Sequence, residues 1–144
     1  MPDRRQQKKL KKKRRHIQGR RLSYTVLDSV PNSQKRPVFS LEYLQDSHCI
    51  TLCDDSDKLA FVNTLRKLSK LTWNQIRTSQ RHGLGSEKIY RRAFLVTIPP
   101  KIGLDVTFIA IRFSGLKPMV GFQDERIFHI VWFDKDLNVY EHGS

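Results

Sequence analysis

Histidine has the side chain best suited to proton transfer near neutral pH, and the second part of the chain contains three: His82, His129 and His142. An imidazole can take up a proton in one step and release it in the next. Arginine complements this ability, because its planar guanidinium holds phosphate oxygens through two parallel hydrogen bonds. The cations that could act beside these histidines are Arg81, Arg112, Lys117 and Arg126.

Such a set of side chains suits the cleavage of an RNA backbone. The 2′-OH attacks the adjacent phosphate, so a base must take its proton and an acid must protonate the leaving 5′ oxygen. A fixed cation should also contact the phosphate oxygens while charge develops on them. The sequence shows no Ser-His-acid arrangement, phosphate-binding glycine loop or carboxylate pair, which disfavours hydrolases of those classes.

Two of the candidates also have a purely structural interpretation. His129 lies within an apolar run, where a histidine is more often a hydrogen-bonded core residue. Arg112 is expected on the same strand face as Phe108 and Ala110. It is therefore either a rim residue or a cation on a concave face.

The remaining candidates lie in a loop and at the C-terminal end. Arg81 and His82 precede two glycines, which predicts an exposed loop and favours a functional role for the pair. Tyr140 and His142 are two residues apart, so they share one face if this segment is a strand. Residues so close to a terminus are, however, often only loosely held.

The element around which the chain is organised is the run of residues 127–133, seven β-branched, aromatic or histidine side chains bounded by charged residues. This composition is typical of a strand, and its two apolar faces indicate an interior strand covered on both sides. Strict alternation predicts one face with Ile127, His129, Val131 and Phe133. The opposite face, with Phe128, Ile130 and Trp132, is expected to share a core with Phe61 beneath the first helix.

The remaining pattern predicts an α+β fold: an N-terminal β-hairpin over residues 38–53, two helices, then an antiparallel β-meander. The first helix should begin at the acidic residues 54–57, whose carboxylates favour the N-terminal end of the helix dipole. A capping box at Thr72-Trp-Asn-Gln75 predicts the start of the second helix. Further strands are expected over residues 94–98, 105–113, 119–123 and 139–142.

The chain carries a formal charge of +13, and most of that charge lies at its beginning. Residues 1–21 contain eleven basic side chains and one acid, which leaves 16 basic and 13 acidic side chains in the remainder. We therefore interpret residues 1–37 as a polybasic arm and linker and residues 38–144 as a single domain. Lys117 and Arg126 and the arm's cations are expected to bind nucleic acid. The arm's cations are Arg4, Arg5, Lys8, Lys9, Lys11, Lys12, Lys13, Arg14, Arg15, Arg20 and Arg21.

The two cysteines and the hydropathy pattern indicate whether a disulfide, a metal site or a membrane segment is to be expected. Cys49 and Cys53 lie in an expected strand, where a four-residue separation places their Cα atoms about 13 Å apart, beyond the reach of a disulfide. Their spacing fits no common zinc pattern, so we expect neither a metal nor another cofactor. We also expect no membrane segment and a cytoplasmic location.

The C-terminal half resembles the meander of the RelE/ParE-like superfamily of bacterial toxins. The resemblance lies in Phe108-Ile-Ala-Ile-Arg112, Met119-Val-Gly-Phe122 and Ile127-Phe-His-Ile-Val-Trp132, and the layout extends over residues 38–142. The arm and residues 81–93 lie outside the family pattern. Family members cut messenger RNA with basic and aromatic side chains, and the matching positions here are Arg112, His129, Tyr140 and His142.

The resemblance implies a toxin of a toxin–antitoxin module that acts as a metal-independent RNA endonuclease on ribosome-bound mRNA, with a small antitoxin protein as partner. Arg112 would hold the phosphate, a histidine would move protons, and Tyr140 would stack on a base. Two alternatives stay open: a noncatalytic RNA- or ribosome-binding protein that uses the basic arm, and a toxin-fold inhibitor of a protein target such as a topoisomerase. One fold hosts many activities, so the site has to decide among them.

Deletion of residues 1–21 should weaken RNA or ribosome binding and flatten its salt dependence, because fewer phosphates are neutralised. Sequence preference should survive the deletion, since contacts to phosphate carry no base information. Binding titrations of the full and shortened chains over a series of salt concentrations measure both effects. Equal affinities at every salt concentration would reduce the arm to a solubilising tail.

Overall fold

The computed structural model describes residues 29–79 and 85–143. The chain divides into two units, Met1–Pro31 and Asn32–Ser144, and the second contains all the elements described below. The cations of the expected arm, together with Arg81 and His82, lie outside the described residues. No helix in the described ranges is long and apolar enough to cross a membrane.

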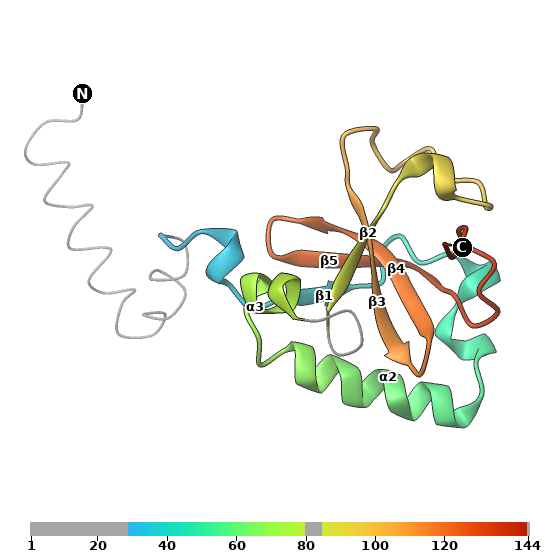
Figure 1. Cartoon of the computed structure of the whole chain (residues 1–144), viewed down its shortest axis with the longest axis horizontal. Coiled ribbons are helices and arrows are strands. Elements are labelled where there is room, and N and C mark those ends of the chain that lie inside the picture. Colours follow the sequence, from blue (N-terminus) through green and yellow to red (C-terminus); the bar gives the residue numbers. More distant parts are fainter. Residues whose placement is uncertain (1–28, 80–84, 144) are drawn as a thin grey trace, which may run out of the picture. The chain divides into compact units, whose positions relative to one another are not determined.

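Five strands form one mixed sheet in the order β1-β5-β4-β3-β2, and two helices complete an α+β fold (Figure 1). The expected meander is present, because β3, β4 and β5 pair antiparallel in chain order. β2 adds to β3 antiparallel at one edge, whereas β1 pairs parallel with β5 at the other. The strands are β1 (Val38–Ser40), β2 (Ser86–Ile89), β3 (Phe108–Ser114), β4 (Lys117–Asp124) and β5 (Ile127–Phe133).

Local capping sets where the helices begin, as the sequence predicts. In α2 (Asp55–Leu68) the Asp54 side chain accepts a hydrogen bond from the Asp57 backbone N–H, and this bond lowers the pKa of the Asp54 carboxyl. In α3 (Trp73–Thr78) both hydrogen bonds of the capping box at Thr72 are formed. Short 3-10 turns occupy η1 (Asn32–Gln34), η2 (Asp46–His48), η3 (Ile50–Leu52) and η4 (Arg91–Ala93).

The expected N-terminal hairpin is replaced by a different pairing. Residues 46–52 form two consecutive 3-10 turns, and β1 pairs with β5 rather than with a returning strand. β5 offers a longer and more apolar partner than the short 49–53 segment, and the Val38 N–H donates to the Arg126 carbonyl at the start of that pairing. The expected strands at 94–98 and 139–142 are likewise reduced to a single bridge between Phe94 and Tyr140.

A β-bulge in β5 overturns the expected alternation of its side chains. Val120 is paired with Trp132 and Gly121 with Ile130, so Val131 is an extra residue without a partner in β4. Its carbonyl accepts a hydrogen bond of 2.9 Å from the Gln45 N–H.

The bulge divides the apolar side chains of β5 between two cores on opposite faces of the sheet. Phe61 of α2 packs with Phe128, Ile130 and Phe133 in the first core. Trp132 lies in the second core with Val131, and not with Phe61 as the alternating pattern suggests. The second core is closed by the loop and C-terminal residues, namely Ile102, Val139 and Tyr140 together with the half-buried Phe94, Val96 and Ile98.

Gly121→Ala should destabilise the protein by about 1–3 kcal/mol or more. A Cβ at Gly121 would lie 1.9 Å from the backbone carbonyl oxygen of His129, and a backbone atom cannot move aside cheaply. Gly143→Ala is the matched control, since nothing lies within 4 Å of a Cβ at that position. Thermal or urea unfolding measures the difference, and equal stability of the two variants would contradict the close approach of β4 and β5.

Candidate functional site

Arg112, Tyr140 and His142, which the sequence analysis singles out, line one small hollow of about 40 Å³. Glu87 of β2 lines it too, although the sequence did not indicate this residue. The hollow lies on the sheet face of the second core, because Ala110 and Tyr140 both line it and belong to that core. Its other lining residues are Gly85, Leu116 and Pro118.

The strand register explains how residues far apart in the chain meet here. Glu87 is paired with Ala110, and Arg112 lies two residues further along the same face of β3. Tyr140 is brought to this face by its bridge to Phe94. On either side of the bridge, Leu95 donates to the Val139 carbonyl and Glu141 donates to the Ala93 carbonyl, both at 2.8 Å.

His142 is held by a buried carboxylate that follows β5. Its Nε2 lies 3.0 Å from Oδ2 of Asp134, which is fully buried. Asp134 also accepts hydrogen bonds from the backbone N–H groups of Asn138 and Val139, at 2.8 and 3.2 Å. The imidazole packs on the Tyr140 ring with 4.0 Å between centroids. The ring is thereby fixed in orientation at the rim of the hollow.

Asp134 is a residue of the candidate site that the sequence did not indicate. A carboxylate directly after a buried strand and before a turn often accepts hydrogen bonds from the turn's backbone, and this signal could have identified it. What the sequence could not show is that His142, eight residues later, returns to the same carboxylate.

The arrangement can hold an anion and move protons beside it. Arg112 supplies a cation, while Glu87 and His142 are two groups that can exchange a proton. A volume of about 40 Å³ has room for one water molecule, which needs about 10–15 Å³, and for little more. The hollow therefore fits a phosphate oxygen or a hydroxyl group, and the rest of any large substrate must lie outside it.

His129 is not part of this hollow. It is buried with its ring stacked on Phe122, 4.9 Å between centroids, and edge-on to Tyr43 at 5.1 Å. Within the described residues its Nδ1 has no hydrogen-bond partner. The surroundings are those of a core histidine.

The two expected nucleic-acid-binding cations outside the arm make contacts within the protein. Lys117 forms a 2.7 Å ion pair with the buried Asp57, which also accepts a hydrogen bond from Ser114. The hydrogen bond to Asp57 raises the pKa of Lys117. Arg126 donates from Nε to the Arg36 carbonyl at 3.0 Å. Both contacts connect segments of the fold.

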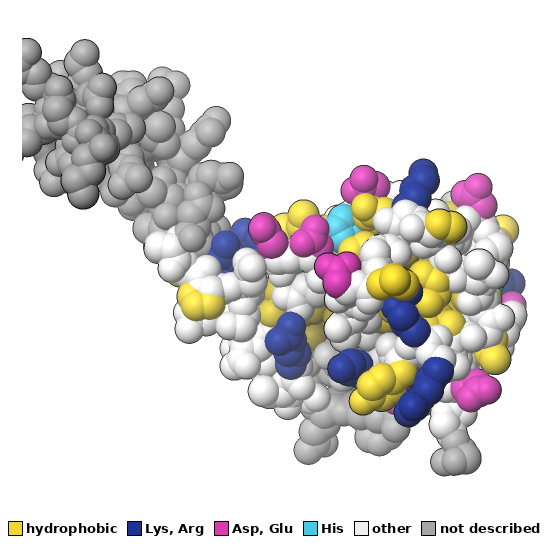
Figure 2. Space-filling view, turned by 90° about the horizontal axis from the view of Figure 1, so that it is seen from above, with side chains coloured by type: hydrophobic (Ala, Val, Ile, Leu, Met, Phe, Trp, Pro, Cys, Tyr) yellow, Lys and Arg dark blue, Asp and Glu magenta, His cyan; other side chains and the backbone are white. Residues whose placement is uncertain are grey.

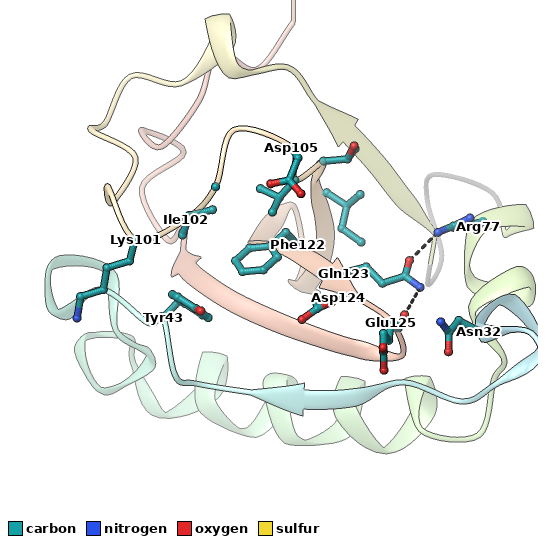
Figure 3. A pocket seen from close by; sticks show the side chains of 14 residues that line it. Asn32, Tyr43, Arg77, Lys101, Ile102, Asp105, Phe122, Gln123, Asp124 and Glu125 are labelled. Atoms are coloured by element: carbon teal, nitrogen blue, oxygen red, sulfur yellow. Dashed lines mark hydrogen bonds between the residues drawn. The ribbon is translucent and has the colours of Figure 1, made fainter. Parts of the chain in front are cut away.

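A second, larger hollow of about 600 Å³ contains none of the expected catalytic residues (Figure 3). Figure 3 shows Lys101 and Arg77 at opposite ends, with Arg77 hydrogen-bonded to Gln123. Tyr43 and Phe122 line the space between them. Three carboxylates, Asp105, Asp124 and Glu125, outnumber these two cations. A polyanion is therefore a poor ligand for this hollow.

Neither cysteine of the chain lines the small hollow. Cys49 and Cys53 are free, and burial raises the pKa of the Cys53 thiol, which makes it a poor nucleophile. The described residues contain no group of three His, Cys, Asp or Glu side chains that could hold a metal ion.

Comparison with protein-family models, with curated proteins and with solved structures found no match for the chain. The function therefore has to be inferred from the geometry of the hollow itself.

Asp134→Ala should lower the free energy of unfolding by roughly 3 kcal/mol, because the backbone N–H groups of Asn138 and Val139 lose their acceptor. His142→Ala should cost no more than about 1 kcal/mol, since this side chain is about one third exposed. Urea unfolding of the two variants measures the difference. A larger loss for His142→Ala would mean that the pair serves the fold and not the hollow.

Proposed function

We propose that the chain is a metal-independent endoribonuclease whose reaction takes place at the hollow lined by Glu87, Arg112, Tyr140 and His142. The observation that supports this most directly is the convergence of a cation, a carboxylate and an oriented imidazole on one small hollow. Cleavage of RNA needs these groups and no cofactor.

The roles follow from the chemistry of each side chain. A carboxylate can act as a base, so Glu87 takes the proton of the 2′-OH while the oxygen of that hydroxyl bonds to the adjacent phosphorus. The bond from phosphorus to the 5′ oxygen breaks, and His142 in its protonated form gives a proton to that oxygen. The products are a 2′,3′-cyclic phosphate and a 5′-hydroxyl end.

Arg112 and Asp134 support this reaction without exchanging protons. The Arg112 guanidinium holds the phosphate oxygens while negative charge gathers on them. Asp134 keeps one imidazole nitrogen of His142 engaged, which fixes the ring's orientation. Tyr140 is buried and lies against that ring, so it supports the imidazole and is not exposed for stacking on a base as the resemblance implies.

The resemblance to RelE/ParE-like toxins adds the biological setting to this proposal. It makes ribosome-bound mRNA the substrate to test first and a small antitoxin protein the expected partner. A basic arm that binds ribosomal RNA would hold the enzyme near such a substrate.

Arg112→Ala should abolish cleavage with little change in melting temperature, and Arg112→Lys should restore only part of the activity because the planar fork is lost. Incubation with ribosome-bound mRNA and mapping of the new 5′-hydroxyl ends measure both. Arg66→Ala is the matched control, an exposed arginine of α2 that should cleave like the unaltered chain.

The same assay tests the two groups that exchange protons. Glu87→Gln and His142→Gln should each lower the rate of cleavage, because an amide can neither take up nor give the proton that the step requires. If Arg112→Ala, Glu87→Gln and His142→Gln all cleave normally, the hollow is not the active site. A chain that binds RNA without producing 5′ ends supports the noncatalytic alternative.

A further inference from the structure

Tyr90 is a large aromatic side chain left on the surface beside two cations. It follows β2 directly, and 57 % of it is exposed. The Lys88 Nζ lies over its ring, 5.2 Å from the centroid, and the Arg92 guanidinium carbon also lies over the ring, at 5.3 Å. Figure 2 shows one face of the protein on which Lys and Arg side chains lie beside hydrophobic ones.

The neighbours of Tyr90 explain why the segment is placed so firmly. Ile89 is buried in the second core, and Ala93 and Phe94 pack against it. Arg91 lies over the Phe108 ring, 5.3 Å from its centroid, and donates to the Gly103 carbonyl. These contacts fix the backbone on both sides of Tyr90, whose own ring contributes little to the core.

Lys88 and Arg92 keep their charges available for a ligand. Both are exposed, and neither forms an ion pair with a carboxylate within the described residues. Lys117, by contrast, is paired with Asp57. An exposed ring between two such cations matches the two parts of a nucleotide, a flat base that stacks on aromatic surfaces and a phosphate that attracts cations.

The small size of the hollow means that an RNA substrate would need a second contact surface, and Tyr90 lies where such a surface is expected. The hollow has room for a reacting group and not for a whole nucleotide, so the flanking nucleotides must contact the protein elsewhere. Tyr90 lies three residues beyond Glu87, about 10 Å along an extended strand. β2 is the outermost strand of the sheet, so a polynucleotide can pass around its edge from the hollow to Tyr90.

We infer that Tyr90, flanked by Lys88 and Arg92, is a stacking platform for an unpaired base of single-stranded RNA. The choice of RNA rests on the proposed function, but the platform requires binding only and not cleavage. A single strand is favoured over a duplex, because the bases of a duplex are already stacked and a protein contacts mainly their backbone. The platform should tolerate any base, since every base has a flat face.

The test uses the full chain and a single-stranded 2′-O-methyl oligonucleotide of about 10 nucleotides, within the site sizes of single-strand binders. This probe lacks the attacking 2′-OH and cannot be cleaved, so the measurement reports binding alone. Fluorescence anisotropy is recorded at moderate and at high salt. At high salt, contacts to phosphate contribute less to the affinity, so the contribution of stacking is easier to measure. The same oligonucleotide annealed to its complement serves as the duplex probe.

Tyr90→Ala should weaken single-strand binding by about 5- to 100-fold, the range found for the loss of one stacked base, and Tyr90→Phe should bind normally. Duplex binding should hardly change. Leu95→Ala is the matched control, because Leu95 is as exposed as Tyr90 and lies nearby but has no ring. Lys88→Ala should reduce the salt dependence, whereas Lys67→Ala on the exposed side of α2 should not.

Two results would overturn the inference: unchanged single-strand binding by Tyr90→Ala, or equal weakening of single-strand and duplex binding. These are separable from failure of the proposed function. If Tyr90→Ala binds normally while Arg112→Ala stops cleavage, the platform fails and the ribonuclease stands. If Tyr90→Ala weakens binding but the unaltered chain never cleaves RNA, the platform stands and the ribonuclease fails.

Discussion

The backbones of β4 and β5 approach each other so closely at Gly121 that a Cβ there would lie 1.9 Å from the His129 carbonyl oxygen. At this contact the ladder shifts by one residue and leaves Val131 as a bulge. The extra residue shifts the alternation of side chains along β5, so Trp132 lies on the opposite face from the one that packs against Phe61. Trp132 and Phe61 therefore belong to different cores. The two packed faces of the sheet, and so the face that carries the hollow, depend on this shift.

A buried carboxylate connects the end of that strand with the candidate site. Asp134 has no exposed surface, and the cost of burying it is offset by hydrogen bonds from two backbone N–H groups and a contact with His142. These contacts hold the turn after β5 in place, and Tyr140 of the C-terminal segment then forms a bridge with Phe94. One residue thus serves the fold and the orientation of a candidate catalytic group.

In the proposed functions, RNA recognition is divided among surfaces that use different interactions. The hollow would make directed contacts to a few atoms of the reacting phosphate, and it is too small for a whole nucleotide. Tyr90 would offer a ring on which any base can stack. The basic side chains of residues 1–21 would add an attraction that is long in range, weak in direction and sensitive to salt.

The sequence alone determined the features that depend on contacts within a few residues. The capping box at Thr72 and the acidic start of α2 were predicted, because a cap joins a side chain to a backbone N–H three residues away. The β3-β4-β5 meander was predicted for a similar reason, since its strands are apolar runs joined by short turns. In the candidate site, Arg112, Tyr140 and His142 were identified by residue type.

Only the tertiary structure decided which distant backbones pair and where a strand changes phase. β1 pairs with β5, almost ninety residues further along the chain, and not with a return strand close by. A local sequence pattern cannot show which of these two partners a strand will pair with. The bulge at Val131 depends on packing against both cores and on the absence of a side chain at Gly121. For the same reason the meeting of Glu87 and Asp134 with His142, and the exposure of Tyr90, could not be predicted. They are consequences of register and burial, which the whole fold fixes at once.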